Sequence, residues 1–195
     1  MKKFELTIEA IKNIKQIGSI ASSSRFLTRK IIKEIDFSKK IRVLELGAGN
    51  GVFTREILKR MSSDSELYTY ENHDGFIPLL KKIKDRRLFV RGECVSSIEL
   101  LPDQHFDIVI SSLPLANLSD RFKENMYKEI QAKLLHTGIF IQYQYFLHDY
   151  RNIEKSFHVC ELDFCLFNLP PAFIYKAKMM EEKAVQLSEA WSQKV

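Results

Sequence analysis

The chain has 195 residues, of which 45% are hydrophobic and 28% charged, a composition typical of one globular domain and short for two. The formal net charge of +5 suits an anionic partner, either nucleic acid or an anionic membrane surface, without choosing between them. No apolar stretch is long enough to span a bilayer, and Glu5 and Glu9 argue against a signal peptide, so we expect a cytoplasmic protein.

The three cysteines, Cys94, Cys160 and Cys165, are an odd number and lie in largely apolar runs. We therefore expect buried thiols in a reducing compartment. No pair of cysteines has a close zinc-type spacing and the five histidines are scattered, so the sequence predicts no metal site.

The first predicted elements are helices. Apolar residues in 4–17 form one stripe with polar residues opposite, which predicts an amphipathic helix that ends at Gly18. The serines at 22–24 offer capping side chains, so we expect a second helix over 25–35. Residues 1–36 are assigned to an N-terminal helical segment.

Strand and helix patterns then alternate. The predicted strands are 41–46, 66–70, 88–90, 106–111 and 139–145, and the predicted helices are 52–61, 76–83 and 121–135. This alternation indicates a parallel sheet with helices on both faces. The last two strand-like runs, 157–167 and 172–176, leave no space for a helix between them and must pair as an antiparallel hairpin. The predicted fold is therefore α/β: a Rossmann-like, doubly wound, mostly parallel seven-stranded sheet over 37–178, with a C-terminal antiparallel hairpin, N-terminal helices and a tail over 179–195.

A glycine-rich loop follows the first strand and opens a helix. The residues that compose it are Glu45, Gly47, Ala48, Gly49, Asn50 and Gly51. Glycines allow the backbone to turn sharply and approach a ligand, and the helix N-terminus suits a carboxylate. The Gly-x-Gly-x-Gly spacing differs from the Gly-x-Gly-x-x-Gly of dinucleotide-binding proteins, so a nicotinamide cofactor is the weaker interpretation. A tight turn without a ligand would explain the glycines equally well.

Glu71, followed by Asn72, ends the second predicted strand about twenty residues beyond the loop, where an acid that holds a ribose belongs in such folds. A solvated loop carboxylate is the alternative. Taken together, the loop, the strand-end acid and the antiparallel finish resemble class I S-adenosylmethionine-dependent methyltransferases over most of the chain. The resemblance implies S-adenosylmethionine as the cofactor, with Glu93 and Cys94 near its adenine, although Glu93 could equally be an exposed turn residue.

The acceptor site is expected after the fourth strand, at Ser111, Ser112, Leu113 and Pro114. Adenine N6-methyltransferases, including the ribosomal RNA dimethylases, carry Asn or Asp at the second of these positions and an aromatic residue after the proline. The amide or carboxylate binds the base amino group and the ring stacks on the base. Here the two positions are Ser112 and Leu115, so both base-specific contacts are missing.

Three stretches, 17–25, 111–115 and 168–172, resemble bacterial phospholipid N-methyltransferases, which act on phosphatidylethanolamine. The resemblance implies that a lipid head-group amine accepts the methyl. The chain departs from the family in Ala21 where proline is frequent, in Asn50 where threonine is commoner, and in 142–145, which only loosely match an aromatic strand end.

Methyl transfer to an amine mainly requires alignment and exclusion of water, and the sequence offers no strong acid–base dyad. Tyr143 and Tyr145 could surround a methylated ammonium by cation–π attraction, worth about 0.5–2 kcal/mol, or could simply pack. Ser24 and Arg25 lie in the first resembling stretch. The guanidinium of Arg25 would suit a lipid phosphate, or it could be a surface charge.

The basic helix predicted over 1–17 could bind an anionic membrane surface, which would place the protein peripherally at the inner face of the membrane, or it could pack on its own domain. Two other functions stay open. The chain could methylate RNA adenine or another small amine, with nucleic acid the weaker partner, or it could bind S-adenosylmethionine without catalysis.

Overall fold

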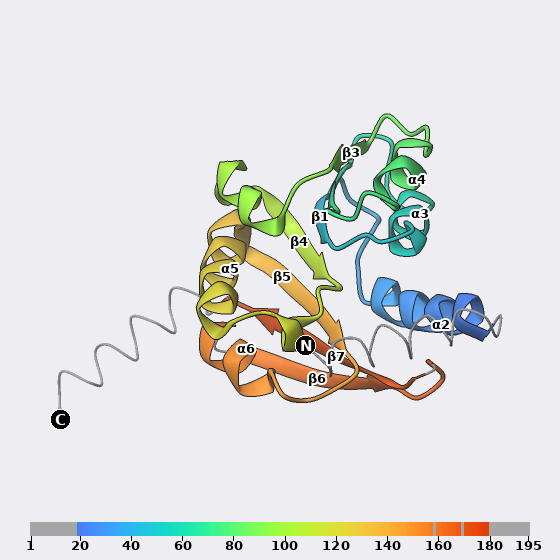
Figure 1. Ribbon diagram of the computed structural model, residues 1–195. Helices are drawn as coiled ribbons and strands as arrows, with labels where there is room; N and C mark the ends of the chain where they lie inside the picture. The colour runs from blue at the N-terminus through green and yellow to red at the C-terminus, as the bar shows by residue number, and fades with distance from the viewer. Residues whose placement is uncertain (1–18, 158, 169, 180–195) are drawn as a thin grey trace, which may run out of the picture.

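The computed structural model describes residues 19–157, 159–168 and 170–179, without the side chains of 19–24 and 159 (Figure 1). The helix predicted over 4–17 and nearly all of the predicted tail lie outside the described residues. Within the described ranges, we find no helix with the length and apolar character needed to cross a membrane.

The described chain forms one seven-stranded sheet in the order β3-β2-β1-β4-β5-β7-β6. The strands are β1 (Arg42–Leu46), β2 (Glu66–Tyr70), β3 (Leu88–Arg91), β4 (Phe106–Ser111), β5 (Leu134–Gln144), β6 (Val159–Cys165) and β7 (Ala172–Lys178). Strands β1 to β5 pair in parallel, whereas β7 lies antiparallel between β5 and β6. The predicted fold class is confirmed, including the antiparallel finish.

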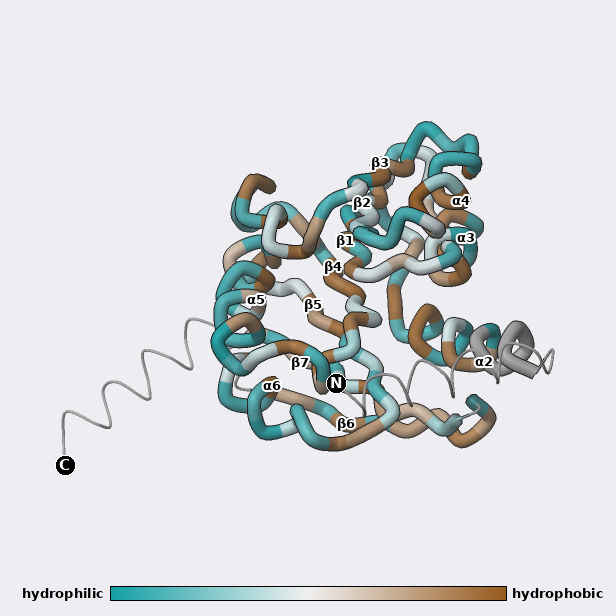
Figure 2. Tube along the Cα trace, viewed as in Figure 1, coloured by the Kyte–Doolittle hydropathy of each residue, from teal (hydrophilic) through white to brown (hydrophobic). Residues whose placement is uncertain are grey.

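Helices cover both faces of this sheet (Figure 1). They are α2 (Ser19–Lys33), α3 (Val52–Leu58), α4 (Ile77–Lys81), α5 (Asp120–Lys133) and α6 (Tyr150–Phe157), with 3₁₀ turns η1 (Val95–Leu100) and η2 (Leu115–Asn117). Successive strand residues point to opposite faces. Val43 packs with apolar residues of α2 and α3, and Leu44 packs with those of α5 and α6. Burial on both faces explains why β1, β4 and β5 are hydrophobic along much of their length (Figure 2).

Helix α2 begins earlier than predicted. The described part of the helix already includes Ser19, so the serines at 22–24 lie inside the helix, and the expectation that they cap it is wrong. Serine is a mediocre helix former but not a breaker, and no glycine or proline interrupts the chain between Ser19 and Lys33. The helix places Leu27, Ile31 and Ile32 in the core, at 2%, 0% and 1% exposure.

Two other boundaries also differ from the prediction. The helix predicted over 121–135 stops at Lys133. The strand predicted over 139–145 begins already at Leu134, with an irregularity where Phe106 pairs with Leu134 but Ile108 pairs with Ile139. The strand predicted over 157–167 starts too early because Phe157 ends α6, a helix that the sequence analysis missed. Ile153 and Phe157, four residues apart, anchor that helix in the core.

Candidate functional site

The glycine loop between β1 and α3 requires glycine for its backbone shape. Gly47, Gly49 and Gly51 have φ angles of 78°, 54° and 81°, which residues with a Cβ rarely adopt. A Cβ on Gly51 would lie 2.9 Å from Leu80 Cδ2, whereas a Cβ on Gly49 would meet nothing within 4 Å. The loop therefore packs tightly on α4 at one end and is open at Gly49.

The loop is fastened to the end of β2 through the backbone. The N–H groups of Gly47 and Ala48 both donate to the carbonyl of Tyr70, at 2.8 and 3.2 Å. This shared acceptor holds the glycine loop beside the residues that follow β2, so the two strand ends predicted to form the site do lie together.

Glu71 completes the same connection with its side chain. Its Oε2 accepts the Gly49 N–H at 2.7 Å, and its Oε1 accepts the His73 N–H at 2.8 Å. The residue is 8% exposed. A carboxylate oxygen can accept more than one hydrogen bond, so both oxygens retain the capacity to bind hydroxyl groups of a ligand.

Glu45 lies beneath the loop and does not line the cleft described below. Its Oε2 accepts hydrogen bonds from the hydroxyls of Thr54 at 2.7 Å and Thr69 at 3.0 Å, and the residue is 3% exposed. Burial raises the pKa of this carboxyl to about 7, although the two threonines favour its ionised form. Glu45 thereby connects β1 to α3 and β2, the elements that flank the glycine loop.

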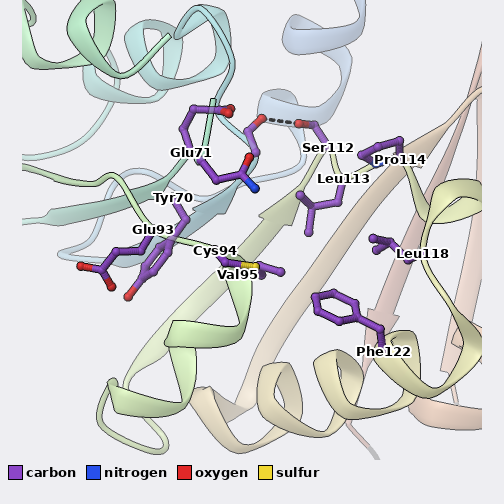
Figure 3. A pocket seen from close by; sticks show the side chains of 12 residues that line it. Tyr70, Glu71, Glu93, Cys94, Val95, Ser112, Leu113, Pro114, Leu118 and Phe122 are labelled. Carbon is purple, nitrogen blue, oxygen red and sulfur yellow. Dashed lines mark hydrogen bonds between the residues drawn. The ribbon is translucent and has the colours of Figure 1, made fainter. Parts of the chain in front are cut away.

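A cleft of about 320 Å³ opens above these strand ends (Figure 3). Its lining residues are Gly47, Tyr70, Glu71, Asn72, Glu93, Cys94, Val95, Ser112, Leu113, Pro114, Leu118 and Phe122. The structure thus brings together residues that the sequence placed after four different strands. Cys94 is exposed, so the expectation that all three thiols are buried is wrong for it. Cys160 is half-buried and Cys165 is buried.

One side of the cleft was not predicted. Tyr70 and Val95 flank the predicted acids, Leu118 precedes α5, and Phe122 lies in the first turn of that helix. Figure 3 shows the Phe122 ring pointing toward the cleft from that helix. The periodicity of 121–135 indicated a helix with an apolar face. It carried no signal that the first turn of this helix borders the cleft rather than the core.

The loop after β4 forms another wall and is held at several points. Ser112 donates its hydroxyl hydrogen to the Gly47 carbonyl and its N–H to the Leu46 carbonyl, the latter at 2.9 Å. The Leu113 carbonyl accepts from Gln142 Nε2 at 3.2 Å and from Gln144 Nε2 at 2.6 Å. The conformation of this loop is therefore set by β1 on one side and β5 on the other.

The remaining predicted residues do not line the cleft. Glu45, Ala48, Gly49, Asn50, Gly51 and Ser111 surround it without appearing in its lining. Tyr143 stacks on Phe53 with ring centroids 5.4 Å apart. Burial raises its pKa, and a hydrogen bond with the side chain of Ser112, a cleft residue, acts in the opposite direction. Tyr145 and Arg25 are exposed outside the cleft, and the side chain of Ser24 lies outside the described residues.

A sequence profile described as "Methyltransferase domain" matches residues 37–186, about three quarters of the chain. The chain belongs to this family. The methyltransferase is 28% identical, over 93% of its own length and 99% of the relative's, to an ornithine lipid N-methyltransferase from Singulisphaera acidiphila. It is 26% identical to a ribosomal RNA small subunit methyltransferase A from Sulfurihydrogenibium, over 80% of this chain but 50% of that protein.

Solved structures show the same fold. A 1,6-didemethyltoxoflavin-N1-methyltransferase from Burkholderia thailandensis, with bound 1,6-didemethyltoxoflavin and S-adenosylhomocysteine, superimposes with a TM-score of 0.67 at 12% identity, covering 90% of this chain and 86% of that one. A precorrin-6y C5,15-methyltransferase from Geobacter metallireducens gives 0.62 at 15% identity, covering 78% and 87%. The protein is a class I enzyme that uses S-adenosylmethionine, as the sequence resemblance implied.

Among the residues that the structure describes, no group of three histidine, cysteine, aspartate or glutamate side chains is placed to hold a metal ion.

Proposed function

We propose that S-adenosylmethionine occupies the cleft, with Glu71 accepting hydrogen bonds from its ribose hydroxyls and with Glu93 and Cys94 beside its adenine. The unused acceptor capacity of Glu71 supports the first contact. The open space at Gly49 supports a close approach of the cofactor to the loop backbone, because no protein atom lies where a Cβ would project.

We further propose that the acceptor is the amine of a lipid head group, such as phosphatidylethanolamine or an ornithine lipid. The conformation of the β4 loop carries this proposal. Leu115, in the position where adenine methyltransferases have a stacking ring, is fully buried, and the Ser112 hydroxyl is engaged by Gly47. Neither residue offers what a flipped base needs. The similarity to an ornithine lipid N-methyltransferase over the full length of both chains supports the same class of acceptor.

S-adenosylmethionine supplies the electrophilic methyl when bound, and the residues of this chain orient the acceptor and exclude water. Leu113, Pro114, Leu118 and Phe122 give the cleft an apolar wall beside the β4 loop. An amine that enters along this wall loses part of its hydration, which favours the neutral, nucleophilic form. The described cleft contains no acid–base dyad, so we expect the ammonium to release its proton to solvent before the neutral amine attacks the methyl.

RNA adenine methylation is the second candidate. It is favoured by the net charge of +5 and by the similarity to ribosomal RNA small subunit methyltransferase A, although the chain spans about half the length of that relative. The missing amide and ring after β4 argue against it.

The experiment that tests the lipid proposal uses the purified full chain and S-adenosylmethionine labelled on the methyl. Phosphatidylethanolamine in mixed micelles, an ornithine lipid in the same micelles, phosphoethanolamine in solution and bulk RNA are offered separately. We expect label in the micellar lipids. Label only in RNA would refute the proposal and favour the second candidate, and label only in phosphoethanolamine would exclude a requirement for the lipid.

A further inference from the structure

Large hydrophobic side chains gather on the surface at the edge of the sheet where β5 ends. We call this set the apolar rim: Phe26, Phe146, Leu147, Leu166 and Phe167, which are 50%, 60%, 45%, 64% and 78% exposed. They come from α2, from the connection between β5 and α6, and from the turn between β6 and β7. Single exposed apolar residues are ordinary, but a cluster drawn from three segments indicates a contact surface.

The three segments are adjacent in the structure. The rings of Phe26 and Phe167 have centroids 6.2 Å apart, which joins α2 to the β6–β7 turn. The strand register joins the turn to the end of β5, because Gln144 pairs with Phe173 at the start of β7. Figure 1 shows the end of the β6–β7 hairpin beside α2.

Ionic and polar contacts hold these segments in place. Lys30 Nζ on α2 donates to Asp163 Oδ1 at 2.8 Å and to the Phe164 carbonyl at 2.7 Å, both on β6. The Tyr175 hydroxyl donates to the Phe146 carbonyl at 3.0 Å. These contacts fix the positions of the three segments that carry the rim. Two backbone carbonyls in these segments, those of Phe146 and Phe164, accept hydrogen bonds from side chains of the protein.

The rim borders the proposed acceptor site. Gln144, whose amide donates to the Leu113 carbonyl in the cleft wall, is separated from Phe146 by a single residue, Tyr145. A surface held by the rim would therefore face the same strand ends as the cleft. Leu100, in contrast, is 80% exposed but stands before β4, toward the amino end of that strand, and belongs to no such cluster.

We propose that the apolar rim inserts into the interfacial layer of a lipid bilayer that contains anionic lipid. Aromatic and leucine side chains at turns suit this layer, where an apolar body meets polar head groups. Arg25 and Arg29 are exposed on α2 on either side of Phe26 in sequence, and they supply charge complementary to anionic head groups. This membrane contact would serve the proposed lipid acceptor, and to that extent it rests on the proposed function, because a docked bilayer would place head-group amines at the cleft. It does not involve the segment 1–17.

The test is flotation of the full chain with vesicles of phosphatidylethanolamine and phosphatidylglycerol. The double variant Leu166→Ser, Phe167→Ser should partition at least tenfold more weakly than wild type, with an unchanged melting temperature and unchanged affinity for S-adenosylmethionine. Leu100→Ser is the matched control, because it removes an equally exposed leucine outside the rim, and it should float like wild type. Equal flotation of the double variant and wild type would overturn the proposal.

A spectroscopic variant separates insertion from other uses of the rim. Trp191 is the one tryptophan in the sequence, so Trp191→Phe combined with Phe167→Trp leaves a single reporter on the rim. Its emission should shift to shorter wavelength with vesicles and be quenched by brominated acyl chains. The proposal would be overturned if the emission maximum already lay at short wavelength without vesicles and moved to longer wavelength in one of two conditions. A shift on deletion of residues 1–18 would show that this segment covers the rim, and a shift on dilution would show that a second copy of the chain covers it.

The two proposals can fail separately. Wild-type protein that floats through the rim but labels only RNA would refute the lipid acceptor and leave the membrane contact standing. Protein that labels micellar lipid but floats equally well with and without an intact rim would refute the membrane contact and leave the acceptor standing.

Discussion

The buried carboxyl of Glu45 makes the stability of this protein depend on pH in a direction that can be predicted. Burial raises its pKa from the ordinary 4.5 to about 7 in the native protein, while the unfolded chain keeps the ordinary value. Glu45→Gln conserves the shape of the side chain. The amide oxygen can accept from Thr54 and Thr69 as the carboxylate Oε2 does. The variant therefore removes the titration and keeps the packing.

The sign follows from proton binding. Between pH 4.5 and about 7, native Glu45 retains a proton that the unfolded chain has released, so wild-type stability falls as pH rises through this window. At about 1.4 kcal/mol for each pH unit, the difference between the two pKa values corresponds to about 3.5 kcal/mol. The stability contributed by protonated Glu45 is fully present below pH 4.5 and lost above about 7.

The measurement is the free energy of unfolding in urea at intervals between about pH 5 and 8, for wild type, Glu45→Gln and Glu161→Gln. Glu161 is an exposed carboxyl on β6 and serves as the matched control. The difference between Glu45→Gln and wild type should rise by about 2.5 kcal/mol between pH 5 and 8, whereas Glu161→Gln should follow wild type. A Glu45→Gln profile parallel to that of wild type would refute the reasoning.

Two further predictions concern the loop. Glu71→Ala removes the acceptor of the Gly49 N–H and should therefore lower the melting temperature. It also removes the proposed ribose contact. At about 1.5–3 kcal/mol for a charged hydrogen bond, this loss should weaken S-adenosylmethionine binding at least tenfold by calorimetry. Glu93 is an exposed residue of the same cleft, so Glu93→Ala should leave the melting temperature unchanged. Unaltered cofactor affinity in Glu71→Ala would contradict the proposed ribose contact. Gly49→Ala should cost about 1–2 kcal/mol of unfolding free energy through its positive φ alone. Gly51→Ala should cost about 1–3 kcal/mol more in urea denaturation because its Cβ would crowd Leu80, and equal losses would argue against this packing.

Apolar periodicity and glycine spacing in the sequence predicted most of the architecture correctly. Strands buried on both faces need nearly continuous apolar runs, so the five parallel strands were visible as such. The loop from Gly47 to Gly51 was visible because its backbone angles suit glycine and few other residues. Acids such as Glu71 could be placed at the site because parallel strands end at the same edge of a sheet.

Helix boundaries depended on packing that the sequence does not display. The serines at 22–24 resembled a helix cap, yet α2 continues through them. The burial of Leu27 and Ile31 in the core stabilises the helix. Helix α6 escaped detection because two apolar anchors, Ile153 and Phe157, form too short a stripe to recognise before the core against which they pack is known.

Tertiary structure alone decided which side chains meet at the site. Gln142 and Tyr143 are neighbours in β5, and alternation sends them to opposite faces of the sheet. Tyr143, which the sequence singled out, lies under α3, where it stacks on Phe53. Gln142, which the sequence did not single out, donates to the Leu113 carbonyl in the cleft wall. The sequence thus determined that a loop, an acid and a strand end would lie together at one cleft, because each of these is a local pattern. Which face of the sheet each strand residue points to, and the position of Phe122 in the cleft wall, depended on how segments distant in sequence pack together. No local sequence pattern contains this information.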